Sequence, residues 1–297
     1  MIIHLKANID KESAVKIATE MSGKLIYDEN KYIIITSSKN DLIPKKYENE
    51  IDNSFIIDND IQLSSKNYIN ETRKVKINNI EVGGDSQNTL MITGPCSIES
   101  KSQIEECAEL LKANGLTTLR AGCFKPRTSP YSFQGLGLEG LKMLSDIRDR
   151  YCFNIISEVK DASHVDDVIE YTDIIQIGAK AMYDHGILRE TGKQKKPVLL
   201  KRGFGSNLQE FVQAAEYILS EGNPNVMLCE RGIRTFETKT RFTLDLCGVS
   251  FLKEYHSNGP VKKLNNEKKK TTGAFMIRCM FSMQPKHTTN DAKEHNK

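Results

Sequence analysis

The chain has 297 residues, of which 38% are apolar and 27% are charged, and its formal net charge is +3. This composition can supply a buried core and excludes a wholly disordered chain. No apolar run reaches the roughly 18 residues that a membrane-spanning helix needs. The first residues do not resemble a secretory leader, and the seven scattered cysteines fit reduced thiols better than a disulfide framework. We therefore expect a cytoplasmic protein without a membrane partner.

Residues 1–60 predict a small α+β domain. A helix is expected behind Asp10, a good N-cap residue, because apolar residues then recur at helical spacing, and Gly23 is expected to end it. Turn residues between two short apolar runs predict a hairpin. In chain order, we expect strands at residues 2–5, 25–27, 32–36 and 54–57, and a short helix at residues 41–47 that is broken by Pro44.

Residues 61–88 are polar and rich in Asn, which predicts a linker. Within this linker, residues 74–82 alternate between apolar and polar side chains, a pattern typical of strands. We expect a hairpin there that covers the floor of the domain that follows.

From residue 89 onward, strand patterns alternate with helical patterns. Such alternation predicts a parallel sheet with right-handed crossovers, and six β-α units over residues 89–256 indicate most of a (β/α)8 TIM barrel. A doubly wound open sheet is the alternative, but no Gly-x-Gly-x-x-Gly opens a helix after a strand. The strands are expected at residues 90–93, 116–121, 153–159, 174–177, 197–200 and 226–229.

Residues 125–137 follow the second predicted strand and read Lys-Pro-Arg-Thr-Ser-Pro-Tyr-Ser-Phe-Gln-Gly-Leu-Gly. Pro126 and Pro130 stiffen this loop because proline fixes φ. Lys125 offers a point charge and Arg127 a planar fork, and both suit phosphate oxygens. In an arbitrary chain, Lys-Pro-Arg-Thr is more often a solvated turn.

Cationic or thiol side chains follow five of the six predicted strands. In a barrel, the residues just past the carboxyl ends of the strands form the site. Together these side chains would concentrate positive potential in one cleft, so the ligand should carry more than one phosphate or carboxylate. In chain order they are Cys96, Arg120, Lys180, Lys201 and Arg231.

Several motifs together resemble those of the 3-deoxy-arabino-heptulosonate-7-phosphate (DAHP) synthases, in the type I group that carries an N-terminal ferredoxin-like regulatory domain. They are Gly-Pro-Cys-Ser-Ile-Glu, the loop above, Gln-Ile-Gly-Ala, Leu-Leu-Lys-Arg-Gly-Phe and Cys-Glu-Arg-Gly-Ile-Arg-Thr-Phe. The resemblance covers about residues 89–256. It implies a transferase that condenses phosphoenolpyruvate with erythrose 4-phosphate and releases phosphate, at the first step of the shikimate pathway toward chorismate and aromatic amino acids.

The same resemblance implies roles for single residues. Arg120, Lys125, Lys201 and Arg231 would bind phosphoenolpyruvate, and Lys125, Pro126, Arg127 and Thr128 would line the erythrose 4-phosphate site. Lys125 would also be the catalytic residue. Lys180 stands where the family usually has Arg, so the charge is kept without the bidentate fork. Cys96 would be the thiolate ligand of a divalent metal, such as manganese or iron, that polarises the aldehyde.

The resemblance also implies a homo-oligomer and feedback control by an aromatic product through residues 1–60. A merely structural role for that domain fits its sequence equally well.

The resemblance ends at about His256. The family strings Asp-Pro-Ser-His and Glu-Val-His, which carry its other metal ligands, do not occur. Residues 257–297 read as a divergent basic tail with a net charge of +6, which we expect to be solvated rather than to bind nucleic acid. We therefore expect an incomplete barrel, weak metal binding and impaired activity. The alternatives are a non-catalytic remnant or regulatory partner of an intact synthase, and a 3-deoxy-octulosonate 8-phosphate synthase, against which the Lys-Pro-Arg-Thr-Ser string argues.

Overall fold

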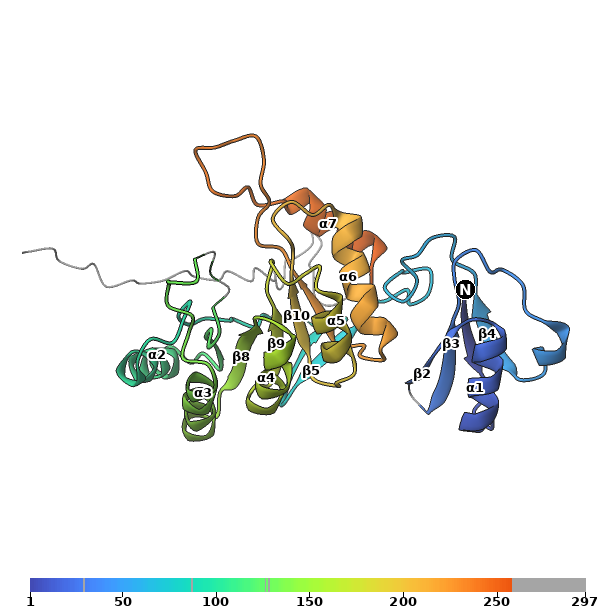
Figure 1. The fold of residues 1–297 in the computed structure, drawn as a ribbon, viewed down its shortest axis with the longest axis horizontal. Helices are drawn as coiled ribbons and strands as arrows, with labels where there is room; N and C mark the ends of the chain where they lie inside the picture. Colours follow the sequence, from blue (N-terminus) through green and yellow to red (C-terminus); the bar gives the residue numbers. More distant parts are fainter. Residues whose placement is uncertain (29, 87, 126, 128, 258–297) are drawn as a thin grey trace, which may run out of the picture.

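A computed structural model of the chain describes residues 1–28, 30–86, 88–125, 127 and 129–257. Its strands form a four-stranded sheet near the amino terminus, a two-stranded hairpin and a five-stranded sheet. Figure 1 shows the first sheet (blue) set beside the larger sheet and its helices. The predicted basic tail, apart from its first residue, lies outside the described residues.

The first sheet has the strand order β2-β3-β1-β4, and all its pairs are antiparallel. Its strands are β1 (Ile2–Leu5), β2 (Lys24–Asp28), β3 (Lys31–Ile35) and β4 (Ile51–Phe55). The predicted helix is present as α1 (Lys11–Glu20), and its apolar face is buried in the cluster that packs on this sheet. Asp10 caps it as predicted, because its carboxylate accepts a 2.9 Å hydrogen bond from the backbone N–H of Ser13.

Three local predictions for this region were wrong in detail. Ser22, not Gly23, takes the left-handed conformation after α1, with φ of 52°. The strand β4 begins three residues earlier than predicted, because its pairing with β1 starts at Ile51. The short helix is a single 3₁₀ turn, η1 (Lys45–Tyr47), that begins after Pro44 rather than being broken by it.

The predicted hairpin is confirmed as the antiparallel pair β5 (Lys74–Ile77) and β6 (Ile80–Gly83). Its apolar side chains are buried in one cluster with side chains from the strands of the larger sheet. The hairpin therefore covers part of one face of that sheet.

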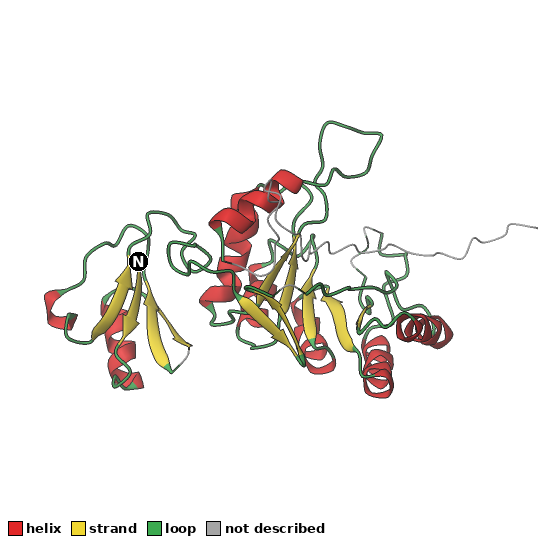
Figure 2. Cartoon of the chain, turned by 180° about the vertical axis from the view of Figure 1, so that it is seen from behind, coloured by secondary structure: helices red, strands yellow, loops and turns green. Residues whose placement is uncertain are grey.

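The larger sheet is parallel throughout, with the sequential order β7-β8-β9-β10-β11. This confirms the prediction of an α/β fold with a parallel sheet. Its strands are β7 (Thr118–Arg120), β8 (Asn154–Val159), β9 (Ile174–Ile177), β10 (Val198–Lys201) and β11 (Val226–Cys229). The helices that precede, connect and follow them, drawn red in Figure 2, are α2 (Lys101–Ala113), α3 (Leu138–Tyr151), α4 (Val165–Tyr171) behind the 3₁₀ turn η2 (Ala162–His164), α5 (His185–Gly192), α6 (Leu208–Ser220) and α7 (Leu246–Tyr255).

The first strand predicted for this sheet, at residues 90–93, is not formed. Only an isolated bridge between Thr93 and Leu119 is present there. Gly94 follows with φ of 135°, and a Cβ at this position would lie 2.4 Å from the carbonyl oxygen of Arg120. The backbone therefore passes very close to the end of β7 without continuing a ladder.

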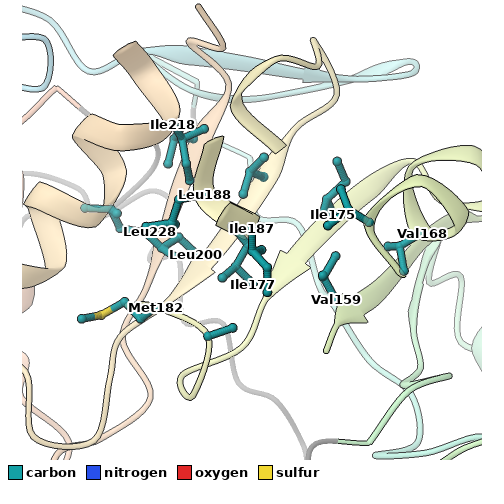
Figure 3. Packing of buried hydrophobic residues seen from close by; sticks show 14 of the residues in the cluster. Val159, Val168, Ile175, Ile177, Met182, Ile187, Leu188, Leu200, Ile218 and Leu228 are labelled. Carbon is teal, nitrogen blue, oxygen red and sulfur yellow. The ribbon is translucent and has the colours of Figure 1, made fainter. Parts of the chain in front are cut away.

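Side chains alternate between the two faces of the parallel sheet, as the strand geometry requires. On one face, Ile175 and Leu200 pack in the largest core cluster with Ile187 of α5 and Ile218 of α6 (Figure 3). The opposite face packs against the hairpin, and Leu199 is buried in that contact. Because side chains two residues apart in a strand point to the same face, this face also carries the polar residues at the carboxyl ends of the strands.

The helix α6 joins the larger sheet to the amino-terminal part of the chain. The carboxylate of Glu216 accepts hydrogen bonds from the backbone N–H groups of Leu63 (3.1 Å) and Ser64 (2.6 Å), and from the Ser64 hydroxyl (2.5 Å). Nearby, Lys24 of β2 forms a 2.6 Å ion pair with Glu221. Among the residues that the structure describes, no helix is long and apolar enough to cross a membrane.

Candidate active site

A cleft of about 260 Å³ opens at the carboxyl ends of the parallel strands. Of the described residues that line it, seven are cationic and one, Glu158, is acidic. Like charges at such density repel one another in an empty cleft and favour a bound anion. The cleft therefore suits a ligand with several negative charges. The cations are Arg120, Lys125, Arg127, Lys180, Lys201, Arg231 and Arg241.

Arg120 at the end of β7 is held by Glu158 of β8. Its Nη2 donates to Oε2 of Glu158 at 2.9 Å, and its Nε donates to Oε1 of Gln176 at 2.9 Å. Gln176 also donates to Glu158, and Nζ of Lys201 lies 3.8 Å from the same carboxylate. Glu158 therefore orients one cation of the cleft and partly neutralises two.

The loop predicted to bind an anion is closed at its base by two backbone hydrogen bonds. The N–H of Lys125 donates to the carbonyl oxygen of Gln134 at 2.8 Å, and the N–H of Gly137 donates to that of Cys123 at 3.0 Å. Gly135 has φ of 96°, and a Cβ there would lie 1.9 Å from the Cys123 carbonyl oxygen, so only glycine fits. The closure leaves Lys125 only 8% exposed, with its side chain lining the cleft.

The ammonium group of Lys125 contacts Cys96 directly. Its Nζ lies 2.8 Å from the Cys96 sulfur and 2.7 Å from the Cys96 carbonyl oxygen. Burial of Cys96 by itself raises the pKa of its thiol, but the hydrogen bond from Lys125 and the charges of Lys125 and Arg120 outweigh it, so the pKa is lowered. In contrast, burial raises the pKa of Cys123 to about 12. Cys96 therefore forms the thiolate more readily than an ordinary cysteine.

The surroundings of Cys96 do not fit a divalent metal within the described ranges. No three His, Cys, Asp or Glu side chains of that part of the chain lie close enough together to hold an ion. One thiolate that already contacts an ammonium group cannot fix the geometry of a divalent ion.

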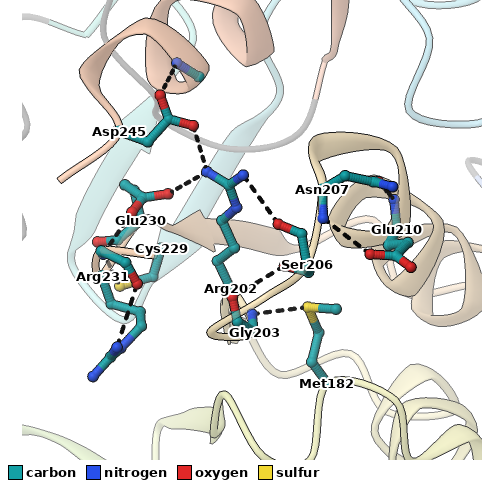
Figure 4. Close-up of polar contacts among 12 residues, drawn as sticks. Met182, Arg202, Gly203, Ser206, Asn207, Glu210, Cys229, Glu230, Arg231 and Asp245 are labelled. Carbon is teal, nitrogen blue, oxygen red and sulfur yellow. Dashed lines mark hydrogen bonds and ion pairs between the residues drawn. The ribbon is translucent and has the colours of Figure 1, made fainter. Parts of the chain in front are cut away.

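Arg202 joins the ends of β10 and β11 to the start of α7, as Figure 4 shows. Its Nη1 donates to Oε2 of Glu230 at 2.9 Å and to Oδ2 of Asp245, the N-cap residue of α7, at 2.7 Å. The side chains of Arg202 and Glu230 are only 4% and 7% exposed. Because Arg202 follows Lys201 and Glu230 precedes Arg231, this cluster holds the backbone beside two cations of the cleft.

The structure brings most of the predicted site residues together in this cleft, although their individual roles stay predictions. Pro126 and Thr128 lie outside the described residues. Glu158, Phe204 and Arg241 line the same cleft and were not among the predicted site residues. Glu158 could have been found as the polar residue at the end of a predicted strand. The predicted residues that line the cleft are Cys96, Arg120, Lys125, Arg127, Lys180, Lys201 and Arg231.

Comparison with known proteins decides the family. Residues 60–261 match the sequence model of the DAHP synthetase I family. The chain belongs to this family. It is similar to the phospho-2-dehydro-3-deoxyheptonate aldolase of Thermotoga maritima, with 43% identity over 196 residues that make up 66% of this chain and 57% of that relative. The chain thus spans 57% of the length of that relative.

Solved structures from Thermotoga maritima resemble this DAHP synthetase I family member. A crystal structure of its phospho-2-dehydro-3-deoxyheptonate aldolase (DAHP synthase) matches with a TM-score of 0.65 and 33% identity, covering 86% of this chain and 76% of that one. A truncated form of 3-deoxy-D-arabino-heptulosonate 7-phosphate synthase matches with a TM-score of 0.60 and 38% identity, covering 66% and 71%. The 2-dehydro-3-deoxyphosphooctonate aldolase of Geobacter sulfurreducens is 32% identical over 169 residues, covering 54% of this chain and 62% of that relative.

Proposed function

We propose that this chain is a transferase that condenses phosphoenolpyruvate with erythrose 4-phosphate to DAHP and phosphate, at the first step of the shikimate pathway. The observation that carries the proposal is the convergence of seven cations on one cleft. The two substrates bring two phosphates and a carboxylate, which require several fixed cations once water is excluded. Family membership and the name of the Thermotoga maritima relative, a phospho-2-dehydro-3-deoxyheptonate aldolase, support the same reaction.

In this reaction, each cation of the cleft contacts phosphoenolpyruvate, erythrose 4-phosphate or both. Lys125 is the proposed catalytic residue, because formation of the new C–C bond leaves negative charge on the former aldehyde oxygen. A cation in a partly buried site stabilises such charge more strongly than it would in bulk water. We assign Arg120, Lys125, Lys201 and Arg231 to phosphoenolpyruvate, Lys125, Pro126, Arg127 and Thr128 to erythrose 4-phosphate, and Lys180 to the cationic surface that both substrates share.

The family resemblance implies a divalent metal, manganese, iron or a similar ion, with Cys96 as one ligand; such an ion would polarise the aldehyde. The described residues do not fit that role on their own, since the thiol contacts Lys125 and no ligand group surrounds it. The steps above therefore rest on the cations. We expect substrate binding to be retained and turnover to be impaired.

We further propose that the parallel sheet belongs to a (β/α)8 TIM barrel over residues 89–256 that is incomplete, with five of the six predicted β-α units formed. The sequential order of five parallel strands supports this architecture. Residues 1–60 would form a ferredoxin-like regulatory domain, which the order β2-β3-β1-β4 with α1 after β1 supports. Residues 61–88 would be the linker and floor hairpin, and residues 257–297 a divergent basic tail.

We also propose that an aromatic amino acid or another pathway product controls the enzyme through residues 1–60, and that the chain works as a homo-oligomer in the cytoplasm. The hydrogen bonds from Leu63 and Ser64 to Glu216, and the Lys24–Glu221 ion pair, support a mechanical link between that domain and α6.

Phosphate release from phosphoenolpyruvate tests the reaction against its two alternatives. The similarity to the Geobacter sulfurreducens relative favours the octulosonate reaction as the second candidate, in which a five-carbon aldose phosphate would supply the other carbons of the eight-carbon product. Release with erythrose 4-phosphate alone, even at the impaired rate that we expect, supports our proposal, and release with the five-carbon sugar alone contradicts it. Binding of phosphoenolpyruvate without release with either sugar indicates a non-catalytic partner.

Calorimetric titration of phosphoenolpyruvate tests the binding step. Arg231→Ala should weaken binding about tenfold, the effect of one charged hydrogen bond. Arg234→Ala is the matched control, because its guanidinium also contacts Phe204 but the side chain does not line the cleft. Equal affinities of the two variants would contradict the assignment of Arg231.

A further inference from the structure

The segment between β11 and α7 is closed at its base and fastened to the sheet. The N–H of Ile233 donates to the carbonyl oxygen of Thr243 at 2.9 Å, and the N–H of Thr243 donates back to Ile233 at 2.9 Å. The N–H of Arg234 donates to the carbonyl oxygen of Phe204 at 2.8 Å. Residues 234–242, the β11–α7 loop, therefore leave the sheet and return beside their starting point. Figure 1 shows the orange loop projecting there.

Phe242, the last residue of the β11–α7 loop, packs on two residues of the cleft. Its ring stacks on Phe204 with centroids 5.5 Å apart and an angle of 15° between the rings. The guanidinium carbon of Arg231 lies 3.8 Å from the Phe242 centroid and 4.9 Å from that of Phe204. Cation–π attraction at these distances holds the guanidinium group against both rings. The base of the loop is thus fixed beside Arg231.

Arg241 precedes Phe242 and lines the same cleft as Lys201 and Arg231. Its guanidinium carbon lies 5.0 Å from the Phe242 centroid, so the ring contacts both arginines. An exposed arginine on an unattached loop would move away from six other cations, because like charges repel. The anchored ring instead keeps Arg241 in the cleft, where an anion would relieve the repulsion.

We propose that Arg241 is a further substrate-binding residue, and that it binds the phosphate group of phosphoenolpyruvate together with Arg231. The inference rests on the proposed function, because it takes phosphoenolpyruvate as the ligand. A guanidinium fork matches two phosphate oxygens at once, so a second arginine on the same wall of the cleft adds directed hydrogen bonds as well as charge. The Phe204–Phe242 stack is the element that positions it.

Calorimetric titration of phosphoenolpyruvate into the full chain and three variants tests this role. Arg241→Ala should weaken binding about tenfold, and Arg241→Lys should restore part of the loss because the charge returns without the fork. Lys239→Ala is the matched control: Lys239 is exposed on the same loop and does not line the cleft, so its removal deletes the same charge elsewhere. This variant should bind within twofold of the wild type. Thermal unfolding checks that all variants are folded.

The outcomes separate this inference from the proposed function. If the wild type binds phosphoenolpyruvate and Arg241→Ala binds equally well, the inference is overturned and the proposed function stands. Equal losses in Arg241→Ala and Lys239→Ala would show that only the net charge of the loop matters, which also overturns it. If the wild type does not bind phosphoenolpyruvate, both proposals are overturned.

A double-mutant cycle tests the positioning by the aromatic stack. Phe242→Leu keeps an apolar side chain but removes the ring face, so it should weaken binding in the wild type. If the ring acts in part through Arg241, the same change costs less in the Arg241→Ala background. Equal costs in both backgrounds would overturn the positioning role of the ring toward Arg241.

Discussion

The guanidinium group of Arg202 and the carboxylate of Glu230 form a buried ion pair with an N–O distance of 2.9 Å. The other carboxylate oxygen of Glu230 accepts a 2.5 Å hydrogen bond from the backbone N–H of Gly232. One carboxylate thus bonds to the loop after β10 and to the residue that follows Arg231. This double attachment fixes the backbone of Arg231 while its side chain stays in the cleft.

Glu230→Gln should lower the free energy of unfolding by about 1–3 kcal/mol, because a buried charged hydrogen bond is replaced by a neutral one. The loss is limited because Asp245 still accepts a hydrogen bond from Arg202. Urea unfolding measures the difference. Glu237→Gln on the exposed β11–α7 loop is the control and should unfold like the wild type. Equal unfolding energies of the two variants would contradict a structural role for the ion pair.

Cys96 should react with iodoacetamide at neutral pH faster than Cys107 and Cys123. The pKa of Cys96 is lowered, whereas burial raises the pKa of both other thiols, and the thiolate is the reactive form. Lys125→Met should slow the labelling of Cys96, since it removes the ammonium group 2.8 Å from the sulfur. Mass spectrometry of labelled peptides over a pH series measures each rate.

Phosphoenolpyruvate supplies the control for this labelling. Bound ligand should protect Cys96, which lines the cleft, and leave the exposed Cys152 unprotected. Unchanged labelling of Cys96 in Lys125→Met would show that the lysine does not activate the thiol.

The parallel strands could be predicted because their signals are local. The strands β8 to β11 consist almost entirely of buried residues. Each is a short apolar run bounded by turn residues in the sequence, so the local pattern was enough to find it. The strand expected at residues 90–93 has the same local pattern but fails. Its pairing depends on how Gly94 passes the end of β7, a contact between distant segments that no local pattern contains.

The residues of the candidate site likewise fall into those with a local sequence signal and those placed by contacts between distant segments. Cations directly after predicted strands could be placed because parallel strands end at one edge. Glu158 lies at the end of a predicted strand, but its partner Arg120 is 38 residues away, so its position alone does not show that an acid belongs in an anion site. Arg241 was missed because it reaches the cleft only through the closure of the β11–α7 loop at Ile233 and Thr243.

Glu216 predicts a pH dependence of stability. Burial raises its pKa, although the hydrogen bonds from Leu63 and Ser64 favour the carboxylate and oppose the shift. The folded state therefore binds the proton more tightly than the unfolded state. The stability from this group is fully present below about pH 4.3, the ordinary value for Glu, and is lost as pH rises through the raised folded pKa.

Comparison with Glu216→Gln isolates this contribution. The variant cannot titrate at this position, so the unfolding free energy of the wild type should fall relative to the variant as pH is raised from 4.5 to 8. Urea unfolding at several pH values measures the difference. A difference that rises with pH would show that the hydrogen bonds outweigh burial and would reverse the sign.

Gly232 should be required for the position of Phe242. Its φ is 88°, and a Cβ at this residue would lie 2.8 Å from Cβ of Phe242. Gly232→Ala therefore imposes a left-handed conformation on alanine, which costs about 1–2 kcal/mol, and pushes the ring away from Arg231. We expect lower stability and a several-fold loss of phosphoenolpyruvate affinity, measured by urea unfolding and calorimetry.

Gly205→Ala is the matched control for this substitution, since Gly205 also lies in a loop at the edge of the cleft, next to Phe204. A Cβ there would meet nothing within 4 Å, and its φ is not positive. Such a change usually stabilises a protein slightly, because alanine has fewer unfolded conformations to lose. If Gly232→Ala matched Gly205→Ala in both stability and affinity, the ring of Phe242 could move without effect on Arg231. The contact between that ring and the cleft would then be incidental to anion binding.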